Sequence, residues 1–371
     1  MQNNTLSRAD LNYENGTVKN VHYGDVLIKF GDYIDASRTD LPYISDDAKA
    51  DKFKNSFLQD GDIIIADTAE DDTVGKCTEI QGSEGLKLLS GLHTVACRPK
   101  EKYGPMFLGY YINSPAYHNQ LKPLMQGIKV TSISKSALQD TDMIMPKSIE
   151  EQTMIGGYFA NLDSLITLQQ RKCDKLVNVK KSMLEKMFAR EGAKVPEIRF
   201  EGFTDDWEQR KLGECFTERK DSMPEGELIS VTIGEGIKKF SELGRHDNSN
   251  DDKSKYKKVC VGDIAYNSMR MWQGASGYSP YEGIVSPAYT VLSPITDVVD
   301  SKCISYLFKR SDMTHVFQMN FQGITSDNWN LKYPALSEIE IMVSPYLAEQ
   351  HKIAAYLSRI DNLITLQQCK S

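Results

Sequence analysis

The chain has 371 residues, enough for two ordinary domains, because one hydrophobic core mostly serves about 100–200 residues. Its 40% hydrophobic and 26% charged residues are typical of a globular protein, and it contains no apolar run near the roughly 20 residues that a bilayer-crossing helix needs. The formal net charge of −7 argues against an overall basic surface, but phosphate binding needs only a local basic patch.

The first residues and the cysteines predict a cytoplasmic protein. Met1–Thr5 has neither the basic start nor the apolar stretch of a secretory signal. The seven cysteines lie at wide intervals, without a Cys-x-x-Cys pair or a His-x-x-x-His partner. We therefore expect free thiols and no metal site, at Cys77, Cys97, Cys173, Cys215, Cys260, Cys303 and Cys369.

Residues 1–146 are expected to form a first α/β domain. Gly61-Asp62 followed by the apolar run Ile63–Ala66 is the pattern of a turn into a buried strand. Later in this segment, residues 126–135 combine a glycine with short polar side chains, which predicts an exposed loop before the last strand.

Residues 147–192 are expected to form a long helical spacer of about 40 residues and roughly 60 Å. Its residues 171–190 carry seven basic side chains against two acidic ones, which predicts an exposed face or a surface for a partner. Gly156-Gly157 predicts a close helix–helix approach. Apolar residues recur at alternating steps of four and three, as in a coiled-coil seam, at Ile155, Phe159, Leu162 and Ile166.

Residues 193–344 are expected to form a second α/β domain, and residues 345–371 a second helical spacer. Gly262-Asp263 again precedes a short apolar strand, and a glycine-flanked loop follows at residues 268–277. The last helix repeats the seam spacing, at Ile353, Leu357, Ile360 and Ile364.

The two helices are copies of each other. Residues 151–170 and 349–368 are identical at 11 of 20 positions without a gap, at an offset of 198 residues. The segments before them are fainter copies at an offset of 196, as Gln126-Gly127 and Gln322-Gly323 illustrate. Such repeats indicate one fold built twice. A duplicated scaffold with divergent loops favours a device that reads two different targets through one mechanism.

Several segments resemble type I restriction-modification specificity subunits. Val195–Phe200, Gly202–Thr204 and Trp207–Glu214 are similar to the opening of a recognition domain in that family, and so are the paired LITLQQ helices and the segment YNSMRMWQGASG. The similarity spans nearly the whole chain. The first 30 residues contain no counterpart of Trp207–Glu214, and the second helix stops at Cys369, so both ends are expected to be shortened.

The resemblance implies two target recognition domains separated by long helices that form an antiparallel coiled coil, with each domain reading half of a split double-stranded DNA site. It also implies that the chain needs no cofactor of its own. S-adenosylmethionine would belong to adenine methyltransferase subunits, expected as two copies. ATP and magnesium would belong to restriction and translocation subunits. The chain itself is then a non-catalytic subunit.

Both loops before the last strand are candidates for DNA contact. Gln and Asn can pair with adenine, Arg and Lys with guanine, and Ser and Thr with phosphate. A polar surface turn is the alternative for these loops, a core position is the alternative for the tryptophan, and an ordinary solvated run is the alternative for Lys253–Lys258 around Tyr256. The candidates are Gln126, Lys129, Ser132, Ser134, Lys135, Lys257, Arg270, Trp272, Gln273, Gln322, Thr325, Asn328 and Asn330.

Motifs of catalysis are missing from the sequence. It has no phosphate-binding loop of the Gly-x-x-x-x-Gly-Lys type. The nearest string to an adenine-methyltransferase motif, Tyr278–Tyr281, lacks the double proline. Two alternatives stay open. One is an autonomous nuclease using Asp297, Asp300 and Lys302; the other is a coiled-coil scaffold that does not touch DNA.

Overall fold

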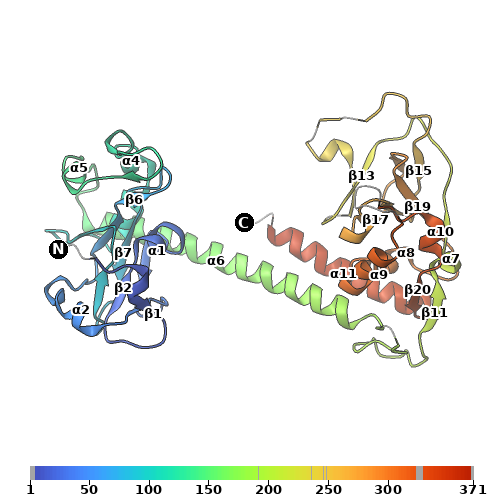
Figure 1. The fold of residues 1–371 in the computed structure, drawn as a ribbon, viewed down its shortest axis with the longest axis horizontal. Coiled ribbons are helices and arrows are strands. Elements are labelled where there is room, and N and C mark those ends of the chain that lie inside the picture. Colours follow the sequence, from blue (N-terminus) through green and yellow to red (C-terminus); the bar gives the residue numbers. More distant parts are fainter. Residues whose placement is uncertain are drawn as a thin grey trace. The chain divides into compact units, whose positions relative to one another are not determined.

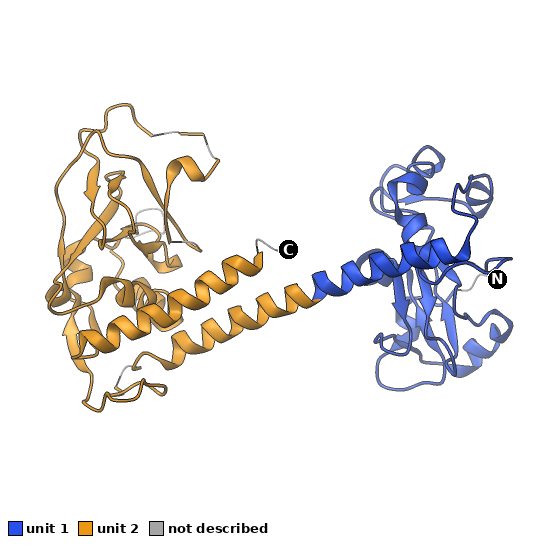
Figure 2. Cartoon of the chain, turned by 180° about the vertical axis from the view of Figure 1, so that it is seen from behind, with its two compact units in different colours: residues 1–167 blue, residues 168–371 orange. Residues whose placement is uncertain are grey.

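The structure is a computed structural model that describes residues 5–190, 192–234, 236–244, 246–247, 249–322 and 329–368. The chain divides into unit 1, residues 1–167, and unit 2, residues 168–371 (Figure 2). The long helix α6 (Ile149–Lys186) carries the chain from one unit into the other. Within the described ranges, no helix is both long and apolar enough to cross a membrane.

Unit 1 contains two four-stranded sheets and a two-stranded ribbon (Figure 1). The central strand β5 pairs antiparallel with β7 and β9, whereas β3 joins β7 in parallel. The strands of the first sheet, in spatial order, are β3 (Tyr33–Asp35), β7 (Cys77–Gln81), β5 (Ile63–Ala66) and β9 (Thr94–Cys97). The second sheet has β1 (Leu11–Asn12), β4 (Tyr43–Ile44), β2 (Lys19–Val21) and β8 (Leu88–Ser90), and the ribbon joins β10 (Thr131–Ser132) to β6 (Thr68–Ala69).

Unit 1 also contains short helices, of which α1 and α3 pack on strands of the first sheet. The short helices are η1 (Arg8–Asp10), α1 (Tyr23–Ile28), α2 (Asp47–Asp51), η2 (Lys54–Ser56), α3 (Phe107–Asn113), α4 (Pro115–His118), η3 (Lys122–Leu124) and α5 (Lys135–Gln139). Alternate residues of β5 enter different cores: Ile63 and Ile65 pack with α3, and Ile64 packs with α1. This period of two explains why the apolar run Ile63–Ala66 is buried on both faces.

Among its described residues, unit 2 has one four-stranded sheet and three two-stranded ribbons. The sheet runs β12 (Phe216–Glu218), β19 (Tyr289–Pro294), β16 (Ile264–Asn267) and β17 (Ser276–Tyr278). The ribbons are β11 (Glu208–Lys211) with β20 (Glu340–Val343), β13 (Ile229–Thr232) with β14 (Gly236–Lys239), and β15 (Lys257–Val259) with β18 (Gly283–Val285). The helices are α7 (Leu212–Cys215), η4 (Phe240–Glu242), η5 (Met271–Gln273), α8 (Ser301–Leu307), α9 (Ser311–Met319), α10 (Tyr333–Ser337) and α11 (Leu347–Gln368).

The Gly-Asp turn has the same chemistry in both units. Gly61 and Gly262 have φ of 84° and 95°, the left-handed region that glycine occupies without strain. Asp62, which follows the first, is buried and binds Arg98 through two hydrogen bonds of 2.9 and 2.7 Å. Asp263 is equally buried and binds Arg219 at 2.7 and 3.1 Å. The repeated motif is therefore a buried carboxylate that pairs with a partly exposed arginine at the start of the central strand.

The repeated helices are fixed to their own units by a repeated glutamine. In α6, Gln152 accepts from Gly104 N at 2.9 Å and donates to Pro146 O at 2.7 Å. In α11, Gln350 accepts from Asp300 N at 2.8 Å and donates to Ser344 O at 2.9 Å. Both glutamines are buried. Buried amides without such partners would be costly, so these bonds fix where each helix begins on its unit.

A repeated tyrosine forms a second hydrogen bond between each helix and its own unit, further along the helix than the glutamine. Tyr110 of α3 donates to Asp163 at 2.5 Å, and Tyr306 of α8 donates to Asp361 at 2.7 Å. The two tyrosines are equivalent at the offset of 196, and the two aspartates are equivalent at the offset of 198. Burial raises the pKa of both hydroxyls, and the carboxylates raise it further, so both tyrosines stay protonated donors.

Gly156 is required by a close approach, although not to another helix as the sequence predicted. A Cβ there would lie 2.4 Å from Pro105 O and 3.0 Å from Phe107 N, in the loop before α3. Gly157 has no atom near its missing Cβ. Only the first glycine of the pair is therefore explained by packing.

The seam residues of the two helices differ in burial. In α11, Ile353, Leu357 and Ile360 are buried, the first two in the core of unit 2, and Ile364 is half-buried. In the first part of α6, Ile155 packs on unit 1, while Phe159, Leu162 and Ile166 are exposed. The reason is that α11 packs against α8 and the end of α6.

Within unit 2, the second half of α6 and α11 run antiparallel, side by side in both views (Figures 1 and 2). Lys180 of α6 joins Asp361 of α11 through an ion pair of 2.5 Å. Beyond the end of α6, Met187 and Phe188 enter the same core as Ile353 and Leu357. The predicted antiparallel helix pair is present in this part of the chain.

Candidate nucleic-acid interface

The first candidate loop is a tight hairpin on unit 1. Gln126 and Ser132 exchange both backbone hydrogen bonds, at 2.9 and 2.8 Å, and thereby close residues 127–131 into a turn. Gly127, with φ of 125°, begins the turn, and a Cβ there would lie 2.0 Å from Val130 O. The tip is exposed, and Ile128 is fully accessible. A small, rigid, protruding hairpin is suited to enter a DNA groove.

The second candidate loop is closed in the same way on unit 2. Gln322 and Asn330 exchange two backbone hydrogen bonds of 3.0 Å. The rings of Phe321 and Trp329 lie 6.2 Å apart beside this closure. The predicted contacts Thr325 and Asn328 lie outside the described residues.

Both loops occupy the same place in their units. Ile133 N, just after the first loop, donates to Asp67 O at 2.9 Å, and Leu331 N, just after the second, donates to Ser268 O at 2.8 Å. Asp67 directly follows the central strand β5, and Ser268 directly follows the central strand β16. The glutamine-closed loops therefore lie beside the end of the same strand in each unit.

The remaining candidates of unit 1 lie on the exposed surface beside its hairpin. Ser134 is the N-cap of α5, and its hydroxyl accepts from Ala137 N at 3.1 Å. Lys129 and Lys135 are exposed and form no ion pair with any described residue, as does Arg270 on unit 2. Their charges are thus available to phosphate or guanine.

Arg270, Trp272 and Gln273 share one exposed turn. They lie on or beside η5, which ends at Gly274 with φ of 77°. Trp272 is exposed, so the alternative of a core tryptophan is not what the structure shows; Met271 is the side chain of this turn that enters the core. The turn lies at the end of β16, beside Ser268 and hence beside the second loop.

Lys309 fixes this turn, and sequence reasoning missed it. Its ammonium donates to Gly274 O at 2.6 Å, Ser276 O at 2.7 Å and Ile233 O at 3.2 Å. Burial, and to a lesser extent the charge of Lys180, lowers the pKa of Lys309 to about 8. A lysine between α8 and α9 has no sequence pattern that distinguishes it from a surface lysine. Ile128 and Met269 were also missed, although apolar residues in a polar loop are a usable signal.

The second half of the basic run Lys253–Lys258 is engaged within unit 2. Tyr256 is buried, and its hydroxyl accepts from Asn250 N, so it cannot pack on a sugar as the sequence suggested. Lys257 pairs with Glu218 at 3.6 Å, and Lys258 pairs with Glu282 at 3.3 Å. These ion pairs neutralise lysine charges that would otherwise be available to DNA phosphates.

Two of the three residues of the nuclease alternative, Asp300 and Lys302, have structural roles. Asp300 is the N-cap of α8, where it accepts from Cys303 N at 2.9 Å, and it lies 3.3 Å from His351. Lys302 donates to Ser358 at 2.9 Å. In the part of the chain that the structure describes, no three His, Cys, Asp or Glu side chains gather as metal ligands.

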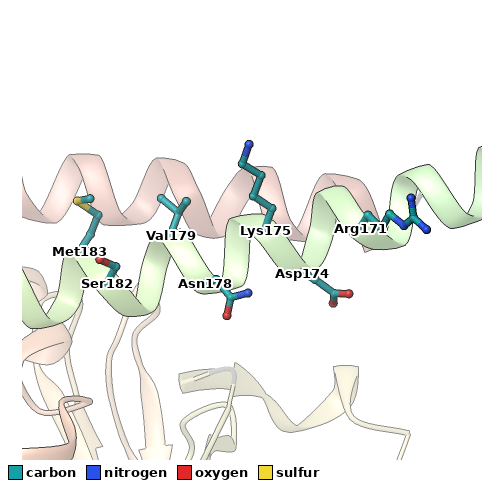
Figure 3. A pocket seen from close by; sticks show the side chains of 7 residues that line it. All are labelled: Arg171, Asp174, Lys175, Asn178, Val179, Ser182 and Met183. Atoms are coloured by element: carbon teal, nitrogen blue, oxygen red, sulfur yellow. The ribbon is translucent and has the colours of Figure 1, made fainter. Parts of the chain in front are cut away.

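The basic part of α6 carries a shallow groove of about 490 Å³. Figure 3 shows that all its lining side chains come from successive turns of this one helix. The lining residues are Arg171, Asp174, Lys175, Asn178, Val179, Ser182 and Met183. The first three are exposed, which agrees with the exposed face that the charge pattern predicts.

Comparisons with known proteins agree on one family. Residues 204–371 match the type I restriction modification DNA specificity domain. The MjaX specificity subunit assigned to a type I restriction enzyme of Methanocaldococcus jannaschii is 26% identical over 180 residues, which are 47% of this chain. The match spans 42% of that relative's own length, less than half of it.

Among solved structures, the type I restriction-modification S subunit of M. genitalium shares the fold. The superposition has a TM-score of 0.51 at 12% identity and covers 100% of this chain and 88% of that one. The HsdS subunit of Thermoanaerobacter tengcongensis is matched at 17% identity with a TM-score of 0.43, over 85% of this chain and 76% of that one.

Proposed function

We propose that the chain is a type I restriction-modification specificity subunit, which reads a two-part DNA sequence and directs partner subunits to it; the match of residues 204–371 to the DNA specificity domain supports this. Each unit reads one half-site through its glutamine-closed loop. The observation that carries this proposal is the repetition of the loop: in each unit a glutamine exchanges two backbone hydrogen bonds with a later residue beside the same strand end, and the enclosed residues, 127–131 and 323–329, differ in sequence and number.

The division of labour within each reading surface follows from the chemistry. In unit 1, Lys129 and Lys135 supply charge for phosphates, while the exposed tip of the hairpin meets base edges. In unit 2, Arg270 can bind guanine through two hydrogen bonds, and the exposed face of Trp272 can pack on sugar or base. Lys309 holds their turn in place.

The partners supply the chemistry. Two adenine methyltransferase subunits would hold S-adenosylmethionine, and restriction subunits would use ATP and magnesium. The exposed basic groove of α6 is the proposed surface for a methyltransferase, because Arg171, Lys172 and Lys175 make no ion pair with any described residue.

The test is reconstitution. The purified chain is mixed with its methyltransferase subunits and a randomised DNA library, and methylated adenines are mapped. We expect no methyl transfer by the chain alone and methylation of one split motif by the complex. Methylation by the chain alone would reject the division of labour. Sequence-independent methylation by the complex would reject the reading role and favour the scaffold alternative.

A further inference from the structure

The β20 edge of unit 2 is covered by a segment for which unit 1 has no counterpart among its described residues. In unit 2, β11 pairs with β20 in an antiparallel register that places Arg210 opposite Ile341 and Glu208 opposite Val343. Leu212 N donates to Ile339 O at 2.8 Å. Since hydrogen-bonded pairs alternate along an antiparallel ladder, Ile341 and Val343 are the residues whose backbone faces β11.

At the offset of 198, the equivalents of Ile341 and Val343 are Met143 and Met145. In unit 1 the backbone groups of the neighbouring residues Asp142 and Ile144 already form hydrogen bonds with side chains of the same unit. Gln120 holds both backbone groups of Asp142, at 3.0 and 3.2 Å, and the Tyr111 hydroxyl accepts from Ile144 N at 2.8 Å. Over the described ranges, no hydrogen bond reaches the backbone of Met143 or Met145. One edge of this segment is therefore closed, and the edge that β11 uses in unit 2 is open.

Side-chain burial shows the same contrast. Ile341 is 4% exposed, whereas its equivalent Met143 is 41% exposed, and the neighbouring Ile144 is 87% exposed. An extended edge with apolar side chains and unused backbone groups is a template for an added strand.

A pair of equivalent carboxylates shows the same contrast between the two units. Glu349 in α11 is buried because Arg199 binds it with two hydrogen bonds of 2.7 and 3.0 Å. Its equivalent in α6, Glu151, is exposed and forms no ion pair with a described residue. A bidentate arginine is the group that this position binds in unit 2.

The helix surface next to the carboxylate extends the pattern. In α11, Lys352 and Tyr356 stay partly exposed but lie against Phe200 and Phe203: the Tyr356 and Phe200 rings lie 6.2 Å apart, and the Lys352 ammonium lies 4.8 Å from the Phe203 ring. Their equivalents in α6 are Met154 and Tyr158, which are 75% and 62% exposed. Both can pack against aromatic rings.

We propose that this face of unit 1, Met143–Met145 with Glu151, Met154 and Tyr158, binds an extended segment of the chemistry of residues 195–214, supplied by a separate polypeptide. The occupant carries an arginine that binds Glu151, one or two aromatic residues that cover Met154 and Tyr158, and a strand that adds to Met143–Met145. The template is the contact that the same chain makes in unit 2.

A synthetic peptide of residues 195–214, labelled with fluorescein, is titrated with the full chain, and hydrogen exchange is measured at residues 142–158. We expect saturable binding and protection of these residues. N-methylation of Arg210 in the peptide removes a backbone donor that faces the strand, and it should weaken binding by about tenfold or more. N-methylation of Gln209, which faces away in the register, is the matched control and should change binding little.

Charge reversal tests the carboxylate. Glu151→Arg in the chain should abolish binding of the peptide, and a peptide with Arg199→Glu should restore it. Because a short peptide can bind weakly, the same segment is also fused ahead of Met1 through a flexible Gly-Ser linker, which raises its local concentration. Protection of residues 142–158 in the fusion supports the proposal.

Three outcomes overturn the proposal. The first is that neither the peptide nor the fusion protects residues 142–158. The second is that the peptide binds only by displacing residues 195–214 from unit 2, seen as exchange at residues 340–356. The third is that the unmodified chain already dimerises through residues 142–158, which makes a second copy the occupant.

Discussion

Replacing Glu349 by Gln should selectively destabilise unit 2, and the magnitude follows from the burial of its ion pair. The side chain of Glu349 is 1% exposed and that of Arg199 is 13% exposed. Removing one partner of a buried pair leaves the other charge uncompensated, at a cost of about 3–5 kcal/mol. Because some water reaches Arg199, we expect the lower end, about 3 kcal/mol.

The assay is urea unfolding followed by tryptophan fluorescence. All three tryptophans, at positions 207, 272 and 329, lie in unit 2, so the signal reports that unit. With an m-value of about 2 kcal/mol/M, the midpoint of Glu349→Gln should fall by roughly 1.5 M. The matched control is Glu151→Gln, which replaces the exposed equivalent and should leave the midpoint unchanged.

A double-mutant cycle separates the ion pair from its packing. Arg199→Met alone leaves a buried carboxylate, whereas Arg199→Met with Glu349→Gln leaves no charge, so the double variant should be more stable than Arg199→Met. A midpoint shift below about 0.3 M for Glu349→Gln, or equal shifts for Glu349→Gln and Glu151→Gln, would refute the reasoning.

Three further predictions concern the reading surface and the helix anchors. Arg270→Ala should weaken binding of the assembled complex to its target by about 1–3 kcal/mol, measured by titration at fixed salt, and a loss equal on unrelated DNA would assign Arg270 to phosphate alone. Lys309→Met should lower specific affinity roughly fivefold to thirtyfold by freeing the η5 turn. The pKa of Lys309 is lowered to about 8 in the folded chain, from 10.5 in the unfolded chain. Between these two pH values the unfolded chain therefore binds a proton that the folded chain has lost, so the free energy of unfolding should rise with pH. This rise should be smaller in Lys309→Met. Tyr306→Phe should cost about 1–2 kcal/mol in urea unfolding through loss of the bond to Asp361, and no change would show that this anchor is dispensable.

Periodicity and repetition in the sequence were sufficient to predict the scaffold. The seam spacing predicted α6 and α11, and glycine followed by branched residues predicted β5 and β16. The offset of 196 predicted that Gln126 and Gln322 take equivalent places, and both close a loop in the structure. These features are local or repeated, so they leave a trace in one sequence.

Contacts between distant segments were beyond the sequence. Arg199 and Glu349 lie 150 residues apart, and Lys309 reaches the carbonyls of a loop more than 30 residues away. Tyr256 was expected to be exposed and is buried, whereas Trp272 had a core position as its alternative and is exposed. The burial of an aromatic residue depends on which elements pack over it, and the sequence alone does not show this. The seam of α11 was recognised as apolar, but its partner proved to be α8 together with the end of α6.

The most direct test of the central claim is to change each loop separately and map adenine methylation in cells that express the chain with its partner subunits. Two variants suffice: one replaces residues 127–131 of unit 1, and the other replaces the η5 turn, residues 270–273, of unit 2. The account predicts a split motif in which each variant alters a different half and leaves the other half and the gap unchanged. Alteration of the same half by both variants, or an unchanged motif in both, would contradict it.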